Sequence, residues 1–341
     1  MFESLTWNMN LRKFARSIEA QAEQAQSAAD AERILRSVLD FAAAHGITYR
    51  WTPTVVLTSV LALIAAGCSV LMPHEQGYAA FFALLTVLTP AVAWKFRRTS
   101  LVKPARTLYR VSVYEHNQMT LHAENSAERW AQLKARFVDF RRGDEDQVID
   151  RWGKGCIAAG DKRYSCELYR FQYVDVRKVT ETVFVASSNS YETRTKTVRE
   201  TRYRSGLIMP FPRAGRIMMS TSGIKPYRHA WRTGSPSFDS LFTVTAEDQF
   251  NAAKILQPAV LGCLKRTAQL ADVALEIRDG VLCLSHSNND WLTMQREVTL
   301  ENPWGVLEAV RSPEELRYRE VLRTLMPLFQ FNDDNFEQVA Q

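Results

Sequence analysis

The fold is decided by two neighbouring stretches without a charged side chain, TPTVVLTSVLALIAAGCSVLM at 52–72 and QGYAAFFALLTVLTPAVAW at 76–94. About 20 apolar residues, each rising about 1.5 Å along a helix, match a hydrocarbon layer about 30 Å thick. Aromatic rings prefer the boundary of that layer, and the ends of the two stretches carry Trp51, Tyr78 and Trp94. The sequence therefore predicts a transmembrane helical hairpin.

The residues around these stretches indicate their orientation. The polar break between them predicts the exposed tip of the hairpin and contains Pro73, His74 and Glu75. Basic residues then follow the second stretch, with no acid before Glu115, at Lys95, Arg97, Arg98, Lys103, Arg106 and Arg110. Because basic residues concentrate on the cytoplasmic side of membrane spans, we expect a two-pass membrane protein with both termini in the cytoplasm. The alternative is a hairpin buried in a soluble core, but core helices usually keep a polar stripe.

The composition and the absence of motifs restrict the function classes. The 341 residues are 46% hydrophobic and 23% charged, which suits one large domain or two smaller ones. The five cysteines form no CxxC pair, and no P-loop, HExxH or GxSxG motif occurs. His286 lies near Asp290 in a polar turn, which is a weak basis for a catalytic pair. We therefore expect no catalytic, cofactor-binding or metal-binding residues, although an enzyme is not excluded.

Two segments outside the membrane stretches have helical periodicity. The amphipathic segment 2–45 carries an apolar stripe at Trp7, Leu11, Phe14 and Ile18. It either lies on the inner leaflet or packs against the protein or a second copy, and the acids on its polar face favour packing. A second stripe follows the expected helix cap Ser126 and stops before Gly143, at Trp130, Leu133, Phe137 and Phe140.

The later part of the chain predicts strands and short helices. β-branched and aromatic residues dominate FQYVDVRKVTETVFVA at 171–186 and TRTKTVRETRY at 193–203. Asp279-Gly280 between alternating apolar arms predicts a hairpin. Thr245 with Asp248 predicts a capping box, and Pro258, Pro303 and Pro313 predict helix starts.

These patterns together predict an α+β protein. Its expected parts are an N-terminal amphipathic helical segment at 1–48, a transmembrane hairpin at 49–98, a juxtamembrane helical region at 99–160, a cytoplasmic mixed α/β domain with antiparallel strands at 161–331, and an acidic tail at 332–341.

A basic segment at 194–232 is the strongest charge feature. Ten basic residues oppose one acid, Glu200, at Arg194, Lys196, Arg199, Arg202, Arg204, Arg213, Arg216, Lys225, Arg228 and Arg232. The segment can contact anionic lipid, form a solvated face or a protein interface, or bind nucleic acid, for which no recognised module is present. The expected anionic-lipid or partner contacts are Lys95, Arg97, Arg98, Lys103, Arg194, Lys196, Arg199, Arg202, Arg204, Arg228 and Arg232.

Within 50–330 the chain resembles the bacterial membrane proteins grouped as domain of unknown function 3137. The matching positions are Phe238, Phe242, Val244, Asp248, Gln249, Ala252, Leu256, Pro258, Asp279 and Gly280. Asp239 replaces the usual Glu, and Gly206 keeps its place while its aromatic neighbours do not. The resemblance implies a two-pass membrane protein without an assigned reaction, in some cases beside LemA-like membrane proteins.

The sequence favours a non-enzymatic scaffold or interaction protein whose cytoplasmic domain contacts a protein partner or a second copy. The alternative is a membrane-bound enzyme or binding protein for lipid or an anionic ligand, which uses the basic segment 194–232. A channel or transporter would require an oligomer, because two spans without charge line no polar path. The expected partners are the lipid bilayer and a protein, with nucleic acid not expected, and no cofactor is expected.

Overall fold

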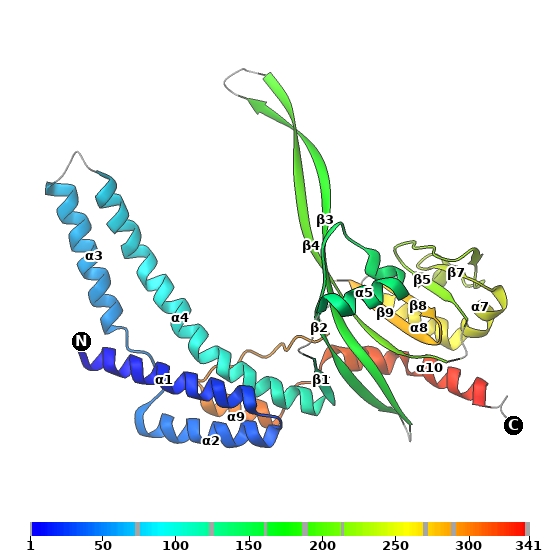
Figure 1. Ribbon diagram of the computed structural model, residues 1–341, viewed down its shortest axis with the longest axis horizontal. Helices are drawn as coiled ribbons and strands as arrows, with labels where there is room; N and C mark the ends of the chain where they lie inside the picture. Colours follow the sequence, from blue (N-terminus) through cyan, green and yellow to red (C-terminus); the bar gives the residue numbers. More distant parts are fainter. Residues whose placement is uncertain are drawn as a thin grey trace. The chain divides into compact units, whose positions relative to one another are not determined.

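The computed structural model divides the chain into two compact units (Figure 1). It describes residues 2–71, 76–122, 126–159, 162–185, 190–212, 215–268, 272–287 and 291–337. The helical unit contains Met1–His116 and Met294–Glu314, and the sheet unit contains Asn117–Thr293 and Glu315–Gln341. The tip expected between the two apolar stretches and the last part of the acidic tail lie outside the described residues.

The helical unit is built from five helices among its described residues. They are α1 Phe2–Gln24, α2 Ala28–His45, α3 Thr52–Leu71, α4 Gln76–His116 and α9 Pro303–Arg311. The segment 2–45 forms two helices rather than one, because Ser27 caps α2: its side chain accepts a hydrogen bond from the Asp30 backbone at 3.1 Å.

The apolar stripes of α1 and α2 are buried inside this unit. Leu11 and Ile18 of α1 and Leu35 of α2 are 0–1% exposed. The rings of Phe14 and Phe41 stack with their centroids 3.9 Å apart. The second half of α4 and α9 complete this core with Leu101, Ala105, Leu108, Tyr109, Val113, Val306, Leu307 and Val310. Helix α1 therefore packs against the protein, one of the two interpretations that its sequence allowed.

Helices α3 and α4 contain stretches long and apolar enough to cross a membrane, beginning at Thr52 and at Ala80. Their side chains are not covered by the rest of the chain: only 6% of the first stretch and none of the second is buried. Leu63 and Val87 are 73% and 70% exposed. A hairpin inside a soluble core would be mostly buried, so the exposure fits a two-pass membrane protein.

The sheet unit contains a nine-stranded antiparallel sheet in the described residues (Figure 1). Its strands are β1 Met119–Leu121, β2 Glu145–Ala159, β3 Lys162–Val185, β4 Ser190–Pro210, β5 Ile217–Ser220, β6 His229–Trp231, β7 Thr243–Ala246, β8 Val273–Arg278 and β9 Val281–Ser287. Their order across the sheet is β1-β2-β3-β4-β9-β8-β5-β7-β6. Each strand pairs with its neighbours in the antiparallel sense.

Helices cover the two faces of this sheet. They are α5 Ser126–Arg136, the 3-10 helix η1 Val138–Arg141, α6 Pro236–Asp239, α7 Gln249–Ile255, α8 Pro258–Ala268 and α10 Arg317–Glu337. On one face, Phe137 and Phe140 pack against Tyr169 and Phe171 of β3. On the other face, α8 and α10 lie together, and the Cys263 thiol donates to the Thr324 carbonyl at 2.7 Å.

Several expected boundaries differ from the structure. The region 99–160 is not helical throughout, because 145–159 form β2. Two glycines lie inside this strand where neighbours come too close for a side chain: a Cβ on Gly153 would lie 2.4 Å from the Thr120 carbonyl oxygen. The expected domain 161–331 is also interrupted, because 294–314 belong to the helical unit.

Of the local turn and cap predictions, the Asp279-Gly280 hairpin and the Asp248 cap are confirmed, and two others are wrong. Asp279 and Gly280 both have positive φ, 51° and 70°, and join β8 to β9 as expected. Asp248 caps α7 by accepting from the Phe250 backbone at 3.0 Å. Thr245 does not take part in a capping box, because it belongs to β7 and is buried. The last helix starts at Arg317 rather than at Pro313.

Replacing Gly206 by alanine is expected to destabilise the sheet unit by at least about 2 kcal/mol. A Cβ there would lie 2.2 Å from the Leu284 carbonyl oxygen and 2.4 Å from the Tyr169 hydroxyl, so β4 and β9 would have to separate. Thermal unfolding of the full-length protein in detergent measures the loss.

The matched control is Gly262→Ala in α8, where no atom lies within 4 Å of the added carbon. Alanine is the better helix former by about 1 kcal/mol, so this variant is expected to unfold at the same or a higher temperature. Equal unfolding temperatures for Gly206→Ala and the unaltered protein would contradict the close approach of the two strands.

Candidate functional site

The four basic residues expected near the membrane all lie on α4, just after Trp94. Lys95 is exposed. Lys103 forms an ion pair with Glu19 of α1, and Arg98 lies 3.5 Å from Glu297. The guanidinium of Arg97 lies over the Trp51 ring, 4.3 Å from its centroid. Arg97 and Arg98 thus lie on aromatic rings, and three of the four basic residues have partners in the helical unit.

The basic segment 194–232 does not form one face of the sheet unit. Arg194, Lys196, Arg199 and Arg202 lie on the outer part of β4, an interior strand of the sheet, whereas Arg228 and Arg232 flank the edge strand β6. Carboxylates neutralise part of the charge: Arg199 pairs with Glu145 at 3.4 Å, Arg202 with Asp175 at 3.0 Å and Arg216 with Asp279 at 2.9 Å. Arg213 lies outside the described residues.

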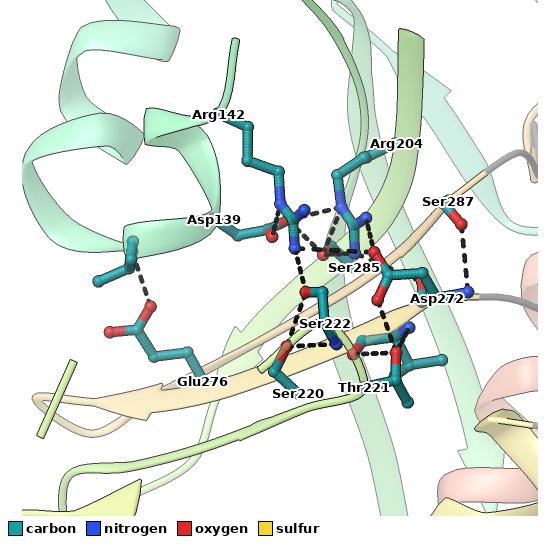
Figure 2. Close-up of polar contacts among 12 residues, drawn as sticks. Asp139, Arg142, Arg204, Ser220, Thr221, Ser222, Asp272, Glu276, Ser285 and Ser287 are labelled. Carbon is teal, nitrogen blue, oxygen red and sulfur yellow. Dashed lines mark hydrogen bonds and ion pairs between the residues drawn. The ribbon is translucent and has the colours of Figure 1, made fainter. Parts of the chain in front are cut away.

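Arg204 corrects one of the expected surface contacts, because its side chain is only 1% exposed. Its Nε donates to Asp139 Oδ2 at 2.8 Å and to the Ser285 hydroxyl at 3.1 Å. Its Nη1 donates to Asp272 Oδ2 at 2.8 Å. Figure 2 shows this guanidinium between the two carboxylates. Arg204 therefore binds inside the sheet unit and is not available to lipid or a partner.

A second arginine completes an alternating network of two cations and two anions. Arg142 donates to Asp139 Oδ1 at 2.6 Å, and its Nη2 lies 3.7 Å from Asp272 Oδ2 (Figure 2). Thr221 donates to the remaining oxygen of Asp272 at 2.6 Å. The network joins η1 to β4, β8, β5 and β9, elements that lie far apart in the sequence. We call these four charged residues the Arg204 network.

The electrostatics of the network keep its groups charged. Burial lowers the pKa of Arg204, but the carboxylates of Asp139 and Asp272 outweigh burial and raise it above its usual value. Burial alone would raise the pKa of Asp272, whereas the Thr221 hydrogen bond and the charge of Arg204 hold it below its usual value. Buried ion pairs are stable only when hydrogen bonds satisfy the remaining oxygens and protons, and that condition is met here.

Glu276 on β8 lies on the same face and is also buried. Its carboxylate accepts the Val138 backbone N–H at 2.8 Å and the Tyr227 hydroxyl at 2.9 Å. Burial raises the pKa of Glu276, because a carboxylate loses its hydration in the interior. Both contacts fasten a segment, η1 or the chain before β6, to the sheet.

The buried polar residues have a structural rather than a catalytic arrangement. The Ser285 hydroxyl is fully buried and donates to Asp139, which holds it within the Arg204 network and away from solvent. His286 is the next residue on the strand and therefore points to the opposite face, and burial lowers its pKa. Its expected neighbour Asp290 lies outside the described residues. Among the residues that the structure describes, no group of three metal-ligating side chains occurs.

The most exposed feature of the sheet unit is a two-stranded ribbon formed by β3 and β4 (Figure 1). In the described part of the chain, the two strands pair only with each other from Asp175–Glu200 to Val185–Ser190. At about 3.3 Å per residue the ribbon extends roughly 30 Å beyond the sheet. A hairpin without further strands is marginally stable in water, and its free edges can pair with another strand.

Sequence reasoning missed the Arg204 network. Asp139 stands in a helical stripe, Asp272 precedes a strand, and Arg204 stands among other basic residues. The local signal available was an arginine on the otherwise apolar face that Gly206 and Ile208 continue, because alternate residues of a strand share a face. The partners themselves are 65 and 68 residues away in sequence.

No family model, curated protein or solved structure matches this chain. The site is therefore interpreted from the chain's own residues. The resemblance to domain of unknown function 3137 rests on the positions given above and stays a proposal.

Replacing Arg204 by methionine is expected to cost about 3–5 kcal/mol of stability, because it leaves Asp139 and Asp272 without their shared cation. Chemical unfolding of the full-length protein in detergent measures the change.

Arg202→Met is the matched control, two residues earlier on the same strand. Its side chain is 46% exposed beside Asp175 and Glu200, and exposed pairs contribute about 1 kcal/mol or less. Similar losses for the two variants would show that burial of the Arg204 network does not govern the stability of the sheet unit.

Proposed function

We propose that the protein is a non-enzymatic, two-pass protein of the bacterial inner membrane with both termini in the cytoplasm, and that its sheet unit is an interaction module. The observation that carries the proposal is the exposure of the apolar faces of α3 and α4. Apolar surface of this extent is unfavourable in water and favourable in lipid. The distribution of basic residues around the spans supports the orientation, and the resemblance to domain of unknown function 3137 supports the bacterial inner membrane.

The interaction role is supported by the distribution of exposed and buried groups in the sheet unit. Its buried charges hold the fold together, as the Arg204 network illustrates, and Ser285 lacks access to a substrate. The ribbon, by contrast, presents two unpaired strand edges. Recognition by addition of a strand uses such edges, because main-chain hydrogen bonds provide affinity and alternate side chains provide specificity. We therefore assign the ribbon of β3 and β4 as the contact element for a protein partner or a second copy.

The resemblance to domain of unknown function 3137 agrees with this proposal, since it implies membrane proteins without an assigned reaction. The alternative function, an enzyme or binding protein that uses 194–232 for an anionic ligand, has less support. That segment is divided between the interior strand β4 and the edge strand β6, and it is partly neutralised by Glu145, Asp175 and Asp279. Arg204, one of its basic residues, is buried.

Placing a charge in the middle of α3 is expected to disrupt membrane integration. Leu63 is 73% exposed near the centre of the helix, and an arginine at the centre of a span costs about 3 kcal/mol on insertion scales. The unaltered protein should stay in the membrane pellet after alkaline carbonate treatment, whereas Leu63→Arg should appear in the supernatant or be degraded.

Phe2→Arg is the control, because Phe2 is 79% exposed on α1 outside the apolar stretches. It should remain in the pellet. In spheroplasts of the same cells, a tag at Gln341 should be protected from added protease. Extraction of the unaltered protein by carbonate would refute membrane integration, and digestion of the tag would refute the orientation.

A photo-crosslinking residue on the ribbon is expected to capture the partner in intact cells. Position Glu181 faces Arg194 across the ribbon and lies beyond all other strands. The same probe at Arg228, an exposed position near β6, is the control and should give no adduct. The mass of the adduct distinguishes a second copy from a different protein. Adducts of equal yield at both positions, or at neither, would contradict the role of the ribbon.

A further inference from the structure

The helical unit contains a hollow of about 750 Å³ beside the ends of the two apolar stretches. Three segments of this unit line it: the connection before α3, the middle of α4 and the extended chain before α9. Its walls contain Trp51, Trp94, Arg97, Arg98, Arg106 and Arg296. We call it the juxtamembrane hollow. Its volume lies within the range of small-molecule sites.

Helix α4 provides one wall through the periodicity of its sequence. Trp94, Arg98, Val102 and Arg106 recur every four residues, so they lie along one side of the helix. The adjoining side of the same turns carries Leu101, Ala105 and Leu108, which are buried in the core of the unit. Packing of that core therefore fixes the direction of the arginine side.

Arg97 is held against this wall by aromatic rings and not by a carboxylate. Its guanidinium lies 4.3 Å from the Trp51 ring centroid and 5.7 Å from that of Tyr49. Its Nη2 donates to the Thr54 hydroxyl at 2.5 Å. Its Nη1 is buried and has no hydrogen-bond partner within the described residues. A buried cationic donor without an acceptor is costly, and an anionic ligand would relieve that cost.

The charged residues that line the juxtamembrane hollow have a net positive charge. Four arginines line it against two glutamates, Glu297 and Glu301. Glu297 pairs with Arg98, but its side chain is 90% exposed, so the pair is weak. In the described part of the chain, no ion pair involves Arg97, Arg106 or Arg296. The hollow is therefore a cationic site whose charge the protein compensates only in part.

The segment that carries Arg296 is fixed in position. Both carboxylate oxygens of Glu314 accept backbone N–H groups, from Gln295 at 2.8 Å and Arg296 at 3.2 Å. The Leu300 backbone donates to the Leu101 carbonyl at 3.1 Å. Leu300 is fully buried. The wall opposite α4 is thus preorganised, which reduces the entropy lost when a ligand binds.

We propose that the juxtamembrane hollow binds the phosphate of an anionic phospholipid headgroup, an inference that rests on the proposed membrane location. Trp51 and Trp94 mark the ends of the apolar stretches, so the hollow lies at the depth where headgroups lie. Arginine guanidinium groups bind phosphate oxygens in pairs of parallel hydrogen bonds. Basic pockets beside membrane spans bind anionic headgroups in this way.

The same chemistry would also accept a phosphate from solution. The lipid is favoured because the exposed apolar sides of α3 and α4 continue from the rim of the hollow and would contact its acyl chains. Lys95, Arg97 and Arg98 were expected to contact lipid as surface charges. The structure instead brings Arg97 and Arg98 into one hollow with Arg106 of the same helix and with Arg296, which is distant in sequence.

The test is a titration of the purified full-length protein in detergent with short-chain phosphatidylglycerol, followed by tryptophan fluorescence, to which Trp51 and Trp94 in the wall of the hollow contribute. Short-chain phosphatidylcholine and inorganic phosphate are titrated in parallel. The combined variant Arg97→Gln, Arg106→Gln, Arg296→Gln is expected to raise the Kd for phosphatidylglycerol on the order of 100-fold. Each arginine near the surface contributes about tenfold or less to this change. Arg106→Gln alone, at an exposed helix position, is expected to weaken it several-fold without altering the unfolding temperature.

A matched control removes three charges elsewhere: Lys196→Gln, Arg228→Gln, Arg232→Gln on the sheet unit, which should bind as the unaltered protein does. Unchanged binding by the variants of the juxtamembrane hollow, or equal binding of phosphatidylglycerol and phosphatidylcholine, would overturn the inference. Inorganic phosphate that competes as strongly as the lipid would assign the site to a soluble ligand instead. Protein that leaves the membrane pellet after carbonate treatment would overturn the proposed function itself, independently of the titration.

Discussion

The requirement that backbone polar groups be hydrogen-bonded within lipid underlies the helical unit. Helix α4 meets it along most of its length from Gln76 to His116, although Pro90 and Pro104 lack the N–H group that would bond the preceding turn. The first part exposes apolar side chains such as Leu84 and Val87, and the second part buries Leu101, Leu108 and Val113 against α1, α2 and α9. In the proposed membrane location, one helix therefore passes from lipid into the core of the helical unit, and the arginines at this junction line the juxtamembrane hollow.

The two units use arginine in opposite ways. In the sheet unit, Arg204 lies between Asp139 and Asp272, which neutralise its charge, and these ion pairs join η1 to the strands. In the helical unit, Arg97 lies on aromatic rings without a carboxylate. Charge alone did not distinguish these environments in the sequence. The environments differ in whether the fold places a carboxylate within hydrogen-bonding distance of the arginine. On this basis we assign a structural role to Arg204 and propose ligand binding for Arg97.

Features determined by neighbouring residues could be predicted from the sequence. The apolar stretches of α3 and α4, the Asp279-Gly280 hairpin and the Asp248 cap depend on local composition and backbone preference. Features determined by residues that are distant in sequence could not be predicted. Strand β2 contains glycines that local propensity disfavours, and only the approach of Thr120 to Gly153 explains them. The return of 294–314 to the helical unit and the hollow that it closes depend likewise on contacts across about 200 residues.

That return has a consequence for biosynthesis. The core formed by α1, α2 and α4 lacks α9 until Arg311 has been translated, about 195 residues after α4 ends. At about 5–20 residues per second, this interval lasts on the order of 10–40 s. During it the apolar groove that receives Val306 and Val310 is open, so the nascent chain needs the membrane, a chaperone or the growing sheet unit to shield it. The helical bundle is therefore completed only shortly before the chain is released from the ribosome.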